Sequence, residues 1–176
     1  MEISQAYRFC PHCGVKRELF SPARPFRCDG CGFTSFFSPV TAVGAVITNP
    51  QGRILLIERA RDPGKGMLGM PGGFVDPNES AEEALRREIL EEVGLSVGEL
   101  TFLTTAPNSY TYHGIVLPVL DIFFSARIAN EQEIEHDDSE VSAWMWTEVG
   151  PEVLSRMAFA SNRLALERFM TVGEAG

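Results

Sequence analysis

Three glutamates near the middle of the chain are spaced so that a helix would bring their carboxylates together. Glu88, Glu91 and Glu92 fall within an arc of roughly 100° on a helical wheel. Like charges at these spacings destabilise a helix unless something positive compensates them. Mg²⁺ and Mn²⁺ take oxygen ligands in octahedral geometry, so the spacing predicts a site for hard divalent cations. An ordinary acidic surface helix is the alternative.

The helix that would carry these acids has recognisable ends and an apolar face. Ser80 followed by Glu83 is a capping box, which predicts a helix start near Ala81, and Gly94 is typical of a helix C-terminus. We also expect Glu83 and Arg87 to pair on the outer side, because they lie four residues apart. Apolar residues recur every fourth position on a stripe that borders the acids: Ala81, Leu85, Ile89 and Val93.

A glycine-rich loop precedes this helix. Glycines in Pro71-Gly72-Gly73 let the backbone approach a ligand closely and expose its carbonyls and amides. Asp76-Pro77-Asn78 has the residues of a turn. A loop and a helix of this kind can hold divalent cations beside a phosphate, which indicates a phosphoanhydride hydrolase.

The segment from Gly73 to Leu95 resembles the signature box of the Nudix hydrolases. That box reads Gly, five residues, Glu, seven residues, Arg-Glu, an aliphatic residue, any residue, Glu-Glu, any residue, Gly and an aliphatic residue. Every defined position is filled in this chain. The resemblance implies a sheet sandwiched between helices over about residues 40–172. It also implies hydrolysis of a nucleoside diphosphate linked to another group.

The resemblance assigns roles to residues of the segment. Glu79 and Arg87 would be structural, holding the loop on the helix behind the metal site. The ligands of Mg²⁺ or Mn²⁺ would be three carboxylates and one backbone carbonyl, those of Glu88, Glu91, Glu92 and Gly72. Together these six residues would form the catalytic and metal-binding site.

The group that takes the proton from the attacking water is not settled by the sequence. In some related enzymes this base lies on the helix, and in others it is a glutamate on a later loop. An acidic loop between two apolar segments offers candidates, among which we single out Glu135; a solvated surface loop is the alternative. The candidates are Glu131, Glu133, Glu135, His136, Asp137, Asp138 and Glu140.

All the cysteines of the chain fall in two Cys-x-x-Cys pairs. The pairs lie 14 residues apart, which is typical of a tetrahedral zinc site with four cysteine ligands. A glycine after each pair allows a tight knuckle in which backbone amides point at the sulfurs. Two disulfides, or a site that has lost its metal, are the alternatives; no export signal precedes the pairs, which disfavours disulfides. The expected zinc ligands are Cys10, Cys13, Cys28 and Cys31.

We expect this zinc to be structural, because so short a segment buries too little apolar surface to fold without it. The segment resembles a zinc ribbon, and a ribbon ahead of the box resembles a subset of the Nudix family that includes NADH pyrophosphatases. His12, between two ligands, is expected to be a bystander. The predicted domains are residues 1–38, the zinc ribbon, and residues 39–176, the hydrolase domain.

Composition and charge limit the class of partner. Zinc ribbons elsewhere bind nucleic acid, but residues 1–39 contain only five Lys or Arg against three Asp or Glu, and the whole chain carries a net charge of −9. A nucleic-acid-binding module would be more basic. No apolar run approaches the roughly 20 residues of a membrane span, and the first residues lack a signal. We therefore expect a cytoplasmic protein that binds neither nucleic acid nor membrane.

Strand and helix signals around the box predict a layered α/β domain with a mixed sheet. Turn chemistry at Asn49-Pro50-Gln51-Gly52 separates the first two strands. Aromatic residues in the later strands, Phe123, Phe124, Trp144 and Trp146, are expected in the core or at an interface rather than in contact with a ligand. The expected strands are residues 41–48, 53–59, 70–75, 100–106, 115–128 and 141–146, and the expected terminal helices are 152–156 and 161–170.

The substrate is a nucleotide derivative by this resemblance, but its identity is less well defined. NADH pyrophosphatases carry Ser-Gln-Pro-Trp-Pro-Phe-Pro after the box, and this chain instead reads APNSYTYHG at residues 106–114. ADP-ribose or a related dinucleotide is therefore favoured over NADH. Tyr110 and Tyr112 could stack on a base or bond a ribose, or simply pack in a strand. Arg59 could meet phosphates, and Phe159 and Asn162 could contact the nucleotide.

Two function classes remain open from the sequence. The first is a Mg²⁺-dependent nucleotide pyrophosphohydrolase, and the second is a Nudix-fold module that senses or binds a nucleotide without cleaving it. The complete set of acids in Arg87-Glu88 and Glu91-Glu92 favours the enzyme, because a module that only binds would not need all three. The oligomeric state is not readable from the sequence, although a homodimer is our expectation.

Overall fold

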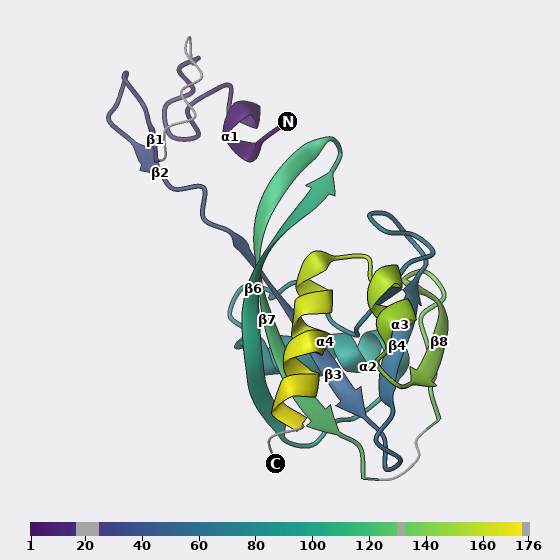
Figure 1. Ribbon diagram of the computed structural model, residues 1–176. Coiled ribbons are helices and arrows are strands. Elements are labelled where there is room, and N and C mark those ends of the chain that lie inside the picture. Colours follow the sequence, from purple (N-terminus) through teal and green to yellow (C-terminus); the bar gives the residue numbers. More distant parts are fainter. Residues whose placement is uncertain (17–24, 130–132, 174–176) are drawn as a thin grey trace. The chain divides into compact units, whose positions relative to one another are not determined.

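The computed structural model describes residues 1–16, 25–129 and 133–173, and the fold divides into two compact units (Figure 1). The first unit comprises Met1–Val40 and Ser109–Val119. The second comprises Thr41–Asn108 and Leu120–Gly176, and it contains the predicted box. Among the described residues, no helix is both long enough and apolar enough to cross a membrane.

A mixed sheet of six strands forms the centre of the second unit. Four strands and a short fifth run in the order β5-β4-β3-β7-β6, and β8 pairs with β4. The arrows of β3 and β7 point the same way in Figure 1, whereas β4 is antiparallel to β3, β5 and β8. The bounds are Val40–Thr48 for β3, Ile54–Arg59 for β4, Leu68–Gly69 for β5, Leu100–Tyr112 for β6, Ile115–Arg127 for β7 and Val141–Thr147 for β8.

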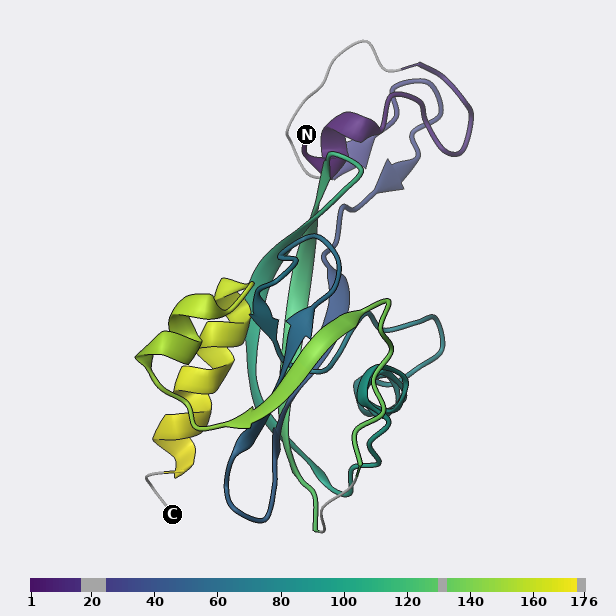
Figure 2. The same ribbon diagram turned by 90° about the vertical axis from the view of Figure 1, so that its right-hand side faces the viewer.

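Helices cover both faces of this sheet. Figure 2 shows α2 (Ala81–Val93) on one face, and α3 (Pro151–Arg156) and α4 (Ala160–Gly173) on the other. Successive residues of a strand point to opposite faces. Alternate residues of β3 therefore belong to two different cores: Ala45 and Ile47 pack on the side of α2, and Val46 packs on the side of α4. The predicted α/β sandwich with a mixed sheet is confirmed.

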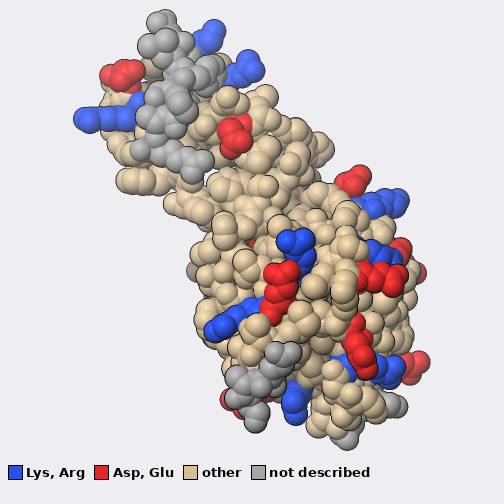
Figure 3. All heavy atoms as spheres, in the orientation of Figure 1, with Lys and Arg blue, Asp and Glu red and all other residues tan. Residues whose placement is uncertain are grey.

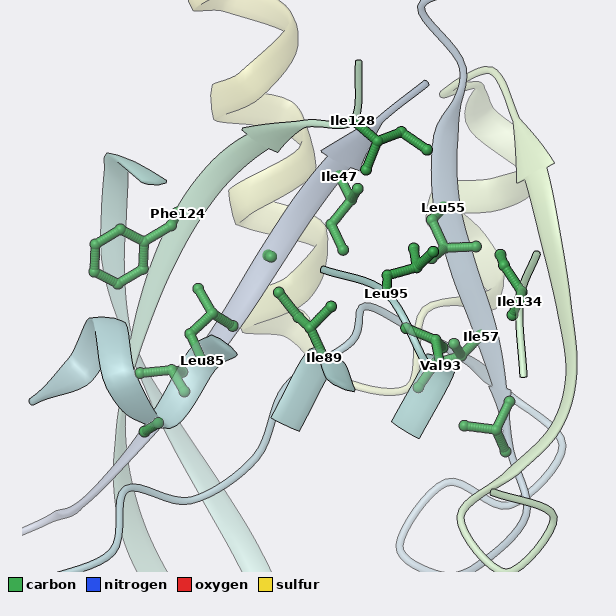
Figure 4. Packing of buried hydrophobic residues seen from close by; sticks show 14 residues of the cluster. Ile47, Leu55, Ile57, Leu85, Ile89, Val93, Leu95, Phe124, Ile128 and Ile134 are labelled. Atoms are coloured by element: carbon green, nitrogen blue, oxygen red, sulfur yellow. The ribbon is translucent and has the colours of Figure 1, made fainter. Parts of the chain in front are cut away.

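Helix α2 begins and ends where the sequence predicts. Ser80 caps its N-terminus, with its Oγ accepting from the Glu83 amide and the Glu83 side chain accepting from the Ser80 amide. Gly94 closes the helix in the left-handed conformation, with φ of 68°. Figure 4 shows Leu85, Ile89 and Val93 directed from the helix toward the sheet. This packing fixes the rotation of the helix, and with it the positions of the acids between those residues.

The loop before α2 is not the strand that we expected over residues 70–75. Strand β5 ends at Gly69, although amides of β3 still donate to the carbonyls of Pro71 and Gly73. A ladder also needs amide donors, but Pro71 has none and the Gly72 amide donates to Glu92 instead. The loop is therefore attached to β3 through the carbonyls of Pro71 and Gly73 and, further on, through the Val75 amide, which donates to Thr41, while the Gly72 amide is bonded to the helix.

The remaining elements of the second unit lie close to their predicted places. Strand β6 is longer than expected, because it continues through Tyr112 to a tight turn at His113 and Gly114. Both turn residues have positive φ, 46° and 78°, which is typical of a two-residue hairpin turn. The two terminal helices and the last strand match their expected positions to within about three residues.

The first unit has a very small core of its own. It contains α1 (Ile3–Ala6) and an antiparallel pair of short strands, β1 (Phe26–Arg27) and β2 (Thr34–Ser35). Its buried side chains include two of the four cysteines and two aromatic rings: Cys10, Cys28, Phe26 and Phe37. So small an apolar cluster is consistent with a unit that depends on a metal for stability.

The packing of α2 on the sheet can be tested with two leucines of the same helix. Leu85 is fully buried and Leu90 is exposed. Leu85→Ala should lower the free energy of unfolding by about 2–5 kcal/mol. Leu90→Ala should change it by no more than about 0.5 kcal/mol. Denaturant titration of both variants measures the difference, and equal losses would show that α2 does not pack on this face.

Candidate active site

The three acids of α2 lie on one side of the helix but differ in exposure. The Glu91 side chain is 61% exposed, that of Glu88 is 15% exposed, and Glu92 as a residue is only 6% exposed. Exposure thus falls from Glu91 through Glu88 to Glu92, which lies nearest the core. The acids border the packed stripe, and Glu92 lies within it.

Glu92 is tied to the glycine loop. Its Oε2 accepts a hydrogen bond of 2.8 Å from the backbone amide of Gly72. The pKa of Glu92 is raised to about 8, chiefly by burial and also by the negative charges of Glu88 and Glu140, while the Gly72 amide and the Arg59 charge act in the opposite direction. A buried carboxylate of this kind gains from any additional positive charge that reaches it.

Glycine is required at one position of the loop, Gly72, and at the next, Gly73, it leaves room for the side chain of Glu88. Gly72 has φ of 146°, and a Cβ there would collide with the backbone of Val43 and Gly44 in β3. A Cβ on Gly73 would lie 2.6 Å from both carboxylate oxygens of Glu88. The loop backbone therefore lies against the sheet on one side and against the acids of α2 on the other.

Arg87 connects the loop to the helix. Its guanidinium binds Glu79 with two hydrogen bonds, 2.8 Å from Nε to Oε1 and 2.9 Å from Nη2 to Oε2. Nη2 also donates to the carbonyl of Phe74, and Nη1 donates to Glu88 at 2.8 Å and to Glu91 at 3.1 Å. These carboxylates raise the pKa of Arg87, with Glu79 contributing most, and Arg87 in turn lowers the pKa of Glu79.

The expected pairing of Arg87 with Glu83 does not occur among the described residues. The Glu83 carboxylate instead accepts from both the amide and the hydroxyl of Ser80 at 2.8 Å. The capping box thus uses the carboxylate that the i,i+4 rule assigned to Arg87. Arg87 instead bonds to Glu79 of the loop and to Glu88 and Glu91 of α2.

One acid of the later loop comes into electrostatic contact with the site. Glu140 raises the pKa of both Glu88 and Glu92, and its own carboxylate binds Arg61 at 2.6 Å. Glu135, which we singled out from the sequence, instead lies with its backbone and Cβ against Gly94 at the end of α2. The sequence could name Glu140 only as one of several acids.

The other loop candidates are placed differently. His136 pairs with Asp138 at 3.1 Å, and Asp137 caps its own turn by accepting from the Ser139 amide. Glu133 is exposed, and Glu131 lies outside the described residues. The backbone amide of Asp137 donates to the carbonyl of Glu92 at 3.1 Å, so this loop is attached to the C-terminal turn of α2.

Of the expected substrate contacts, Arg59 acts on the acids through its charge, and Phe159 lies against Arg59. Its guanidinium carbon lies 5.1 Å from the centre of the Phe159 ring, and its Nε donates to the Pro63 carbonyl at 2.7 Å. The same charge lowers the pKa of Glu92. Tyr110 and Tyr112 belong to the unit that carries the cysteines.

The donor set of this site suits a hard divalent cation. Arg87 compensates Glu88 and Glu91, but no arginine or lysine forms an ion pair with Glu92 in the described ranges. Mg²⁺ prefers oxygen ligands from carboxylates and backbone carbonyls. The site offers three carboxylates that differ in burial, with the backbone of a glycine loop beside them. The Gly72 carbonyl, whose neighbours on both sides accept from β3, completes a set that fits the expected ion.

The four cysteines converge in the first unit. All four Sγ atoms lie within 4.8 Å of one another, and none forms a disulfide. The distance from Cys10 to Cys31 is 3.8 Å and that from Cys13 to Cys28 is 3.6 Å. Tetrahedral zinc with Zn–S bonds of about 2.3 Å requires sulfurs about 3.8 Å apart, so the cluster has the size of a zinc site.

The two cysteine pairs have the same backbone geometry. Gly14 and Gly32 both have φ of 73°, and each donates its amide to the carbonyl of the first cysteine of its pair. Burial opposes ionisation of Cys10, but hydrogen bonds from the backbone of Cys13 and His12 lower its pKa to about 6. The ring of His12 stacks on Phe33 at 5.7 Å. The first knuckle therefore stabilises the thiolate of Cys10, the form that binds zinc, whereas burial and the other three sulfurs raise the pKa of Cys31 to about 12.

Comparison with known proteins agrees with the geometry of the box. A NUDIX domain profile matches residues 38–167, which are most of the chain. The chain belongs to the Nudix family. The matched residues cover the second unit up to residue 167, within α4. They also include two parts of the first unit, residues 38–40 and the β6–β7 hairpin.

Among its relatives, this Nudix chain is similar to the NAD-capped RNA hydrolase NudC of Haemophilus influenzae, with 26% identity over 136 residues. The match covers 76% of this chain and 50% of that protein. The chain therefore spans about half the length of the curated relatives it matches.

Solved structures of Nudix proteins have the same fold. A NUDIX hydrolase from Nitrosomonas europaea superposes with a TM-score of 0.70 at 23% identity, covering 96% of this chain and 93% of that one. The NUDIX domain of Shewanella oneidensis NrtR complexed with ADP ribose superposes with a TM-score of 0.62 at 24% identity, covering 76% and 88%. At this identity the likeness shows the fold alone.

Zinc binding by the cysteines can be measured directly. We expect elemental analysis to find one zinc per chain, and Cys13→Ser to lose most of it, because the metal supplies the folding energy of a unit with so small a core. Hydrogen exchange should then rise in residues 1–16 and 25–40. His12→Ala is the matched control and should keep its zinc. Full zinc retention by Cys13→Ser would contradict the assignment of this ligand.

The raised pKa of Glu92 predicts how stability depends on pH. The folded-state pKa of about 8 exceeds the ordinary value of 4.5, so this group favours the folded state below the ordinary pKa and loses that contribution as pH rises through about 8. Glu92→Gln removes the effect. Without Mg²⁺, the variant should gain stability over the wild type between pH 5 and pH 9 by on the order of a few kcal/mol.

Denaturant titration of zinc-loaded protein, without other divalent ions, measures this difference. Glu167→Gln on the exposed face of α4 is the matched control, because it changes the same chemical group outside the site. Saturating Mg²⁺ should reduce the advantage of Glu92→Gln, because the ion stabilises the ionised wild-type carboxylate. Parallel pH profiles for Glu92→Gln and the wild type would show that Glu92 is not held protonated.

Proposed function

We propose that the chain hydrolyses the pyrophosphate bond of a nucleoside diphosphate derivative in a Mg²⁺-dependent reaction, with ADP-ribose or an NAD(H)-like dinucleotide as substrate. The observation that carries this proposal is the bond between the Gly72 amide and the buried Glu92 carboxylate. It joins the glycine loop to the acidic face of α2. Metal ions held between the two could bind the pyrophosphate of the substrate.

The proposed metal ligands are Glu88, Glu91 and Glu92, with the Gly72 carbonyl. When bound there, Mg²⁺ would neutralise phosphate charge and lower the pKa of a coordinated water. Arg87 has a positioning role, because it holds Glu88 and Glu91 while its other bonds clamp the loop through Glu79. The loop and the acids are thereby kept in register before any ligand arrives.

Glu140 is the loop residue that we propose for the same site. Its charge acts on both Glu88 and Glu92, and Arg61 orients its carboxylate at 2.6 Å. Both acids therefore act at the same site, where a carboxylate is needed to take the proton of the attacking water. We assign the proton acceptor to this pair of acids, Glu92 and Glu140, in preference to Glu135.

The substrate class follows from two kinds of support. Relatives are named NAD-capped RNA hydrolases, and one neighbour in fold was solved with ADP ribose. Both names describe an adenosine diphosphate joined to a second ribose. On this chain, the Arg59 guanidinium stacked on Phe159 gives a fixed positive charge near Glu92, suited to a phosphate of such a substrate.

The face drawn in Figure 3 carries acidic and basic side chains intermixed over the second unit. The net charge of −9 over the whole chain also offers little attraction for a long polyanion. These features favour the free dinucleotide over a capped RNA as substrate. A cytoplasmic location, a homodimer and a purely structural role for the zinc remain predictions from the sequence.

Activity on a nucleotide panel tests the proposal. We expect the purified chain with Mg²⁺ to release AMP from ADP-ribose or NADH, and Mn²⁺ to be the other metal that supports the reaction. Glu92→Gln should lower kcat by at least about two orders of magnitude while the protein stays folded, because it removes both a metal ligand and a proton acceptor. Glu167→Gln should keep wild-type kcat.

The same panel distinguishes the enzyme from a nucleotide-binding module. Saturable binding of ADP-ribose with no product under any metal would favour the module that senses a nucleotide. Wild-type turnover by Glu92→Gln, or turnover without divalent ions, would reject the metal site proposed here. Including a capped RNA oligonucleotide in the panel separates the two kinds of substrate named by the comparisons.

A further inference from the structure

A second group of buried polar side chains lies on the opposite face of the sheet from α2. Asp121 of β7 is 6% exposed and Ser161, at the start of α4, is 2% exposed. Asn108 of β6 donates from Nδ2 to Oδ2 of Asp121 at 2.9 Å. Asn108, Asp121 and Ser161, which we call the buried polar cluster, come from three different elements of the second unit.

The cluster has unused bonding capacity. Burial raises the pKa of Asp121, while Ser161 and Asn108 partly offset this by stabilising its anion. Among the described residues no lysine or arginine forms an ion pair with Asp121. The Ser161 hydroxyl is near the carboxylate but completes no hydrogen bond of standard geometry within the described part of the chain. Buried groups left in this state reduce stability.

A purely structural contact at this place would be better served by apolar side chains. The neighbours on this face are apolar, including Ala106, Phe123 and Ala165. Replacing a buried, poorly compensated charge by apolar groups of similar size is often neutral or stabilising. The cost of Asp121 and Ser161 is therefore more readily explained by a ligand that completes their hydrogen bonds.

The cluster is connected to the candidate active site along two routes within the second unit. Phe123, two residues from Asp121 on the same face of β7, covers Gly44 of β3, and the Pro71 carbonyl of the glycine loop lies against the same glycine. Two residues of a strand span roughly 7 Å. Asp121 thus lies one such step along β7 from the ring that covers Gly44 beside the loop. On the second route, Phe159, two residues before Ser161, stacks with Arg59.

We propose that Asp121, oriented by Asn108 and assisted by Ser161, determines specificity by accepting a hydrogen bond from the exocyclic amino group of the substrate's nucleobase. This inference rests on the proposed function, because it uses the same substrate and deepens its recognition. A carboxylate buried among apolar groups repels phosphates and selects hydrogen-bond donors. A base with an exocyclic amine, such as adenine, offers such a donor at the end of the nucleoside remote from the phosphates.

The amino group distinguishes adenine from hypoxanthine, which carries a carbonyl oxygen at the same position. Two acceptors then face each other in the wild type, so IDP-ribose should be a much poorer substrate than ADP-ribose. Asp121→Asn replaces one acceptor by an NH₂ donor of the same shape. The variant should therefore lose its preference for the amino purine and accept the oxo purine.

The experiment measures kcat/KM of wild type and Asp121→Asn for ADP-ribose and IDP-ribose, with Mg²⁺. We expect the ratio of the two values to fall by roughly ten- to hundredfold in the variant. Ser161→Ala should lower the ratio by a smaller factor. Both variants should melt at or above the wild-type temperature, because Asp121→Asn removes a buried charge and Ser161→Ala removes an unsatisfied buried hydroxyl. Asp29→Asn, an exposed aspartate of the first unit, is the matched control and should keep the wild-type ratio.

Two further arms separate this proposal from its alternatives. Two results would overturn the assignment to the base amine. One is an equal loss of kcat/KM for ADP-ribose and IDP-ribose in Asp121→Asn. The other is a loss of selectivity that appears only between ADP-ribose and an analogue of it that lacks the adenosine 2′-hydroxyl. If the wild type cleaves neither substrate, calorimetric binding of ADP-ribose and IDP-ribose replaces kcat/KM as the readout. A binding preference that Asp121→Asn abolishes would support recognition by the cluster even where the proposed hydrolysis fails, and no preference would overturn it.

Discussion

The hydrogen bond from the Gly72 amide to Glu92 is the interaction on which the arrangement of the candidate site depends. It exists because Gly72 adopts a backbone conformation closed to other residues, and because Glu92 lies inside the packed face of α2. Both partners are costly by themselves, one in conformational entropy and the other in desolvation. Their mutual bond offsets part of that cost and fixes the spacing between loop and helix.

Arg87 changes how the acidic face of α2 is interpreted, because it already supplies positive charge there. From the sequence, three acids on one arc required a compensating charge, and a metal cluster was the simplest candidate. The structure shows that Arg87 already compensates Glu88 and Glu91. The argument for a cation therefore rests on the buried Glu92 with Glu140 nearby, where positive charge is scarce, rather than on the number of acids. Entry of a metal would also compete with Arg87 for its two carboxylates.

Sequence reasoning located the helix, its caps and the sheet layers because each depends on local chemistry or periodicity. Ser80, Gly94 and the apolar stripe of α2 are examples. It failed where one group has two possible partners: Glu83 bonds to Ser80 rather than Arg87, and the Gly72 amide bonds to Glu92 rather than the sheet. It also could not choose Glu140 among neighbouring acids, because that choice depends on how a loop folds back toward α2.

Each face of the sheet carries a buried carboxylate that is costly to desolvate. Glu92 on one face and Asp121 on the other are carboxylates in apolar surroundings whose pKa is raised chiefly by burial. A fold that retains two such groups gives up stability at both, and a ligand spanning from one to the other would recover it at both ends. The nucleoside diphosphate part of the proposed substrate, with phosphates at one end and a base at the other, has the chemistry for that span.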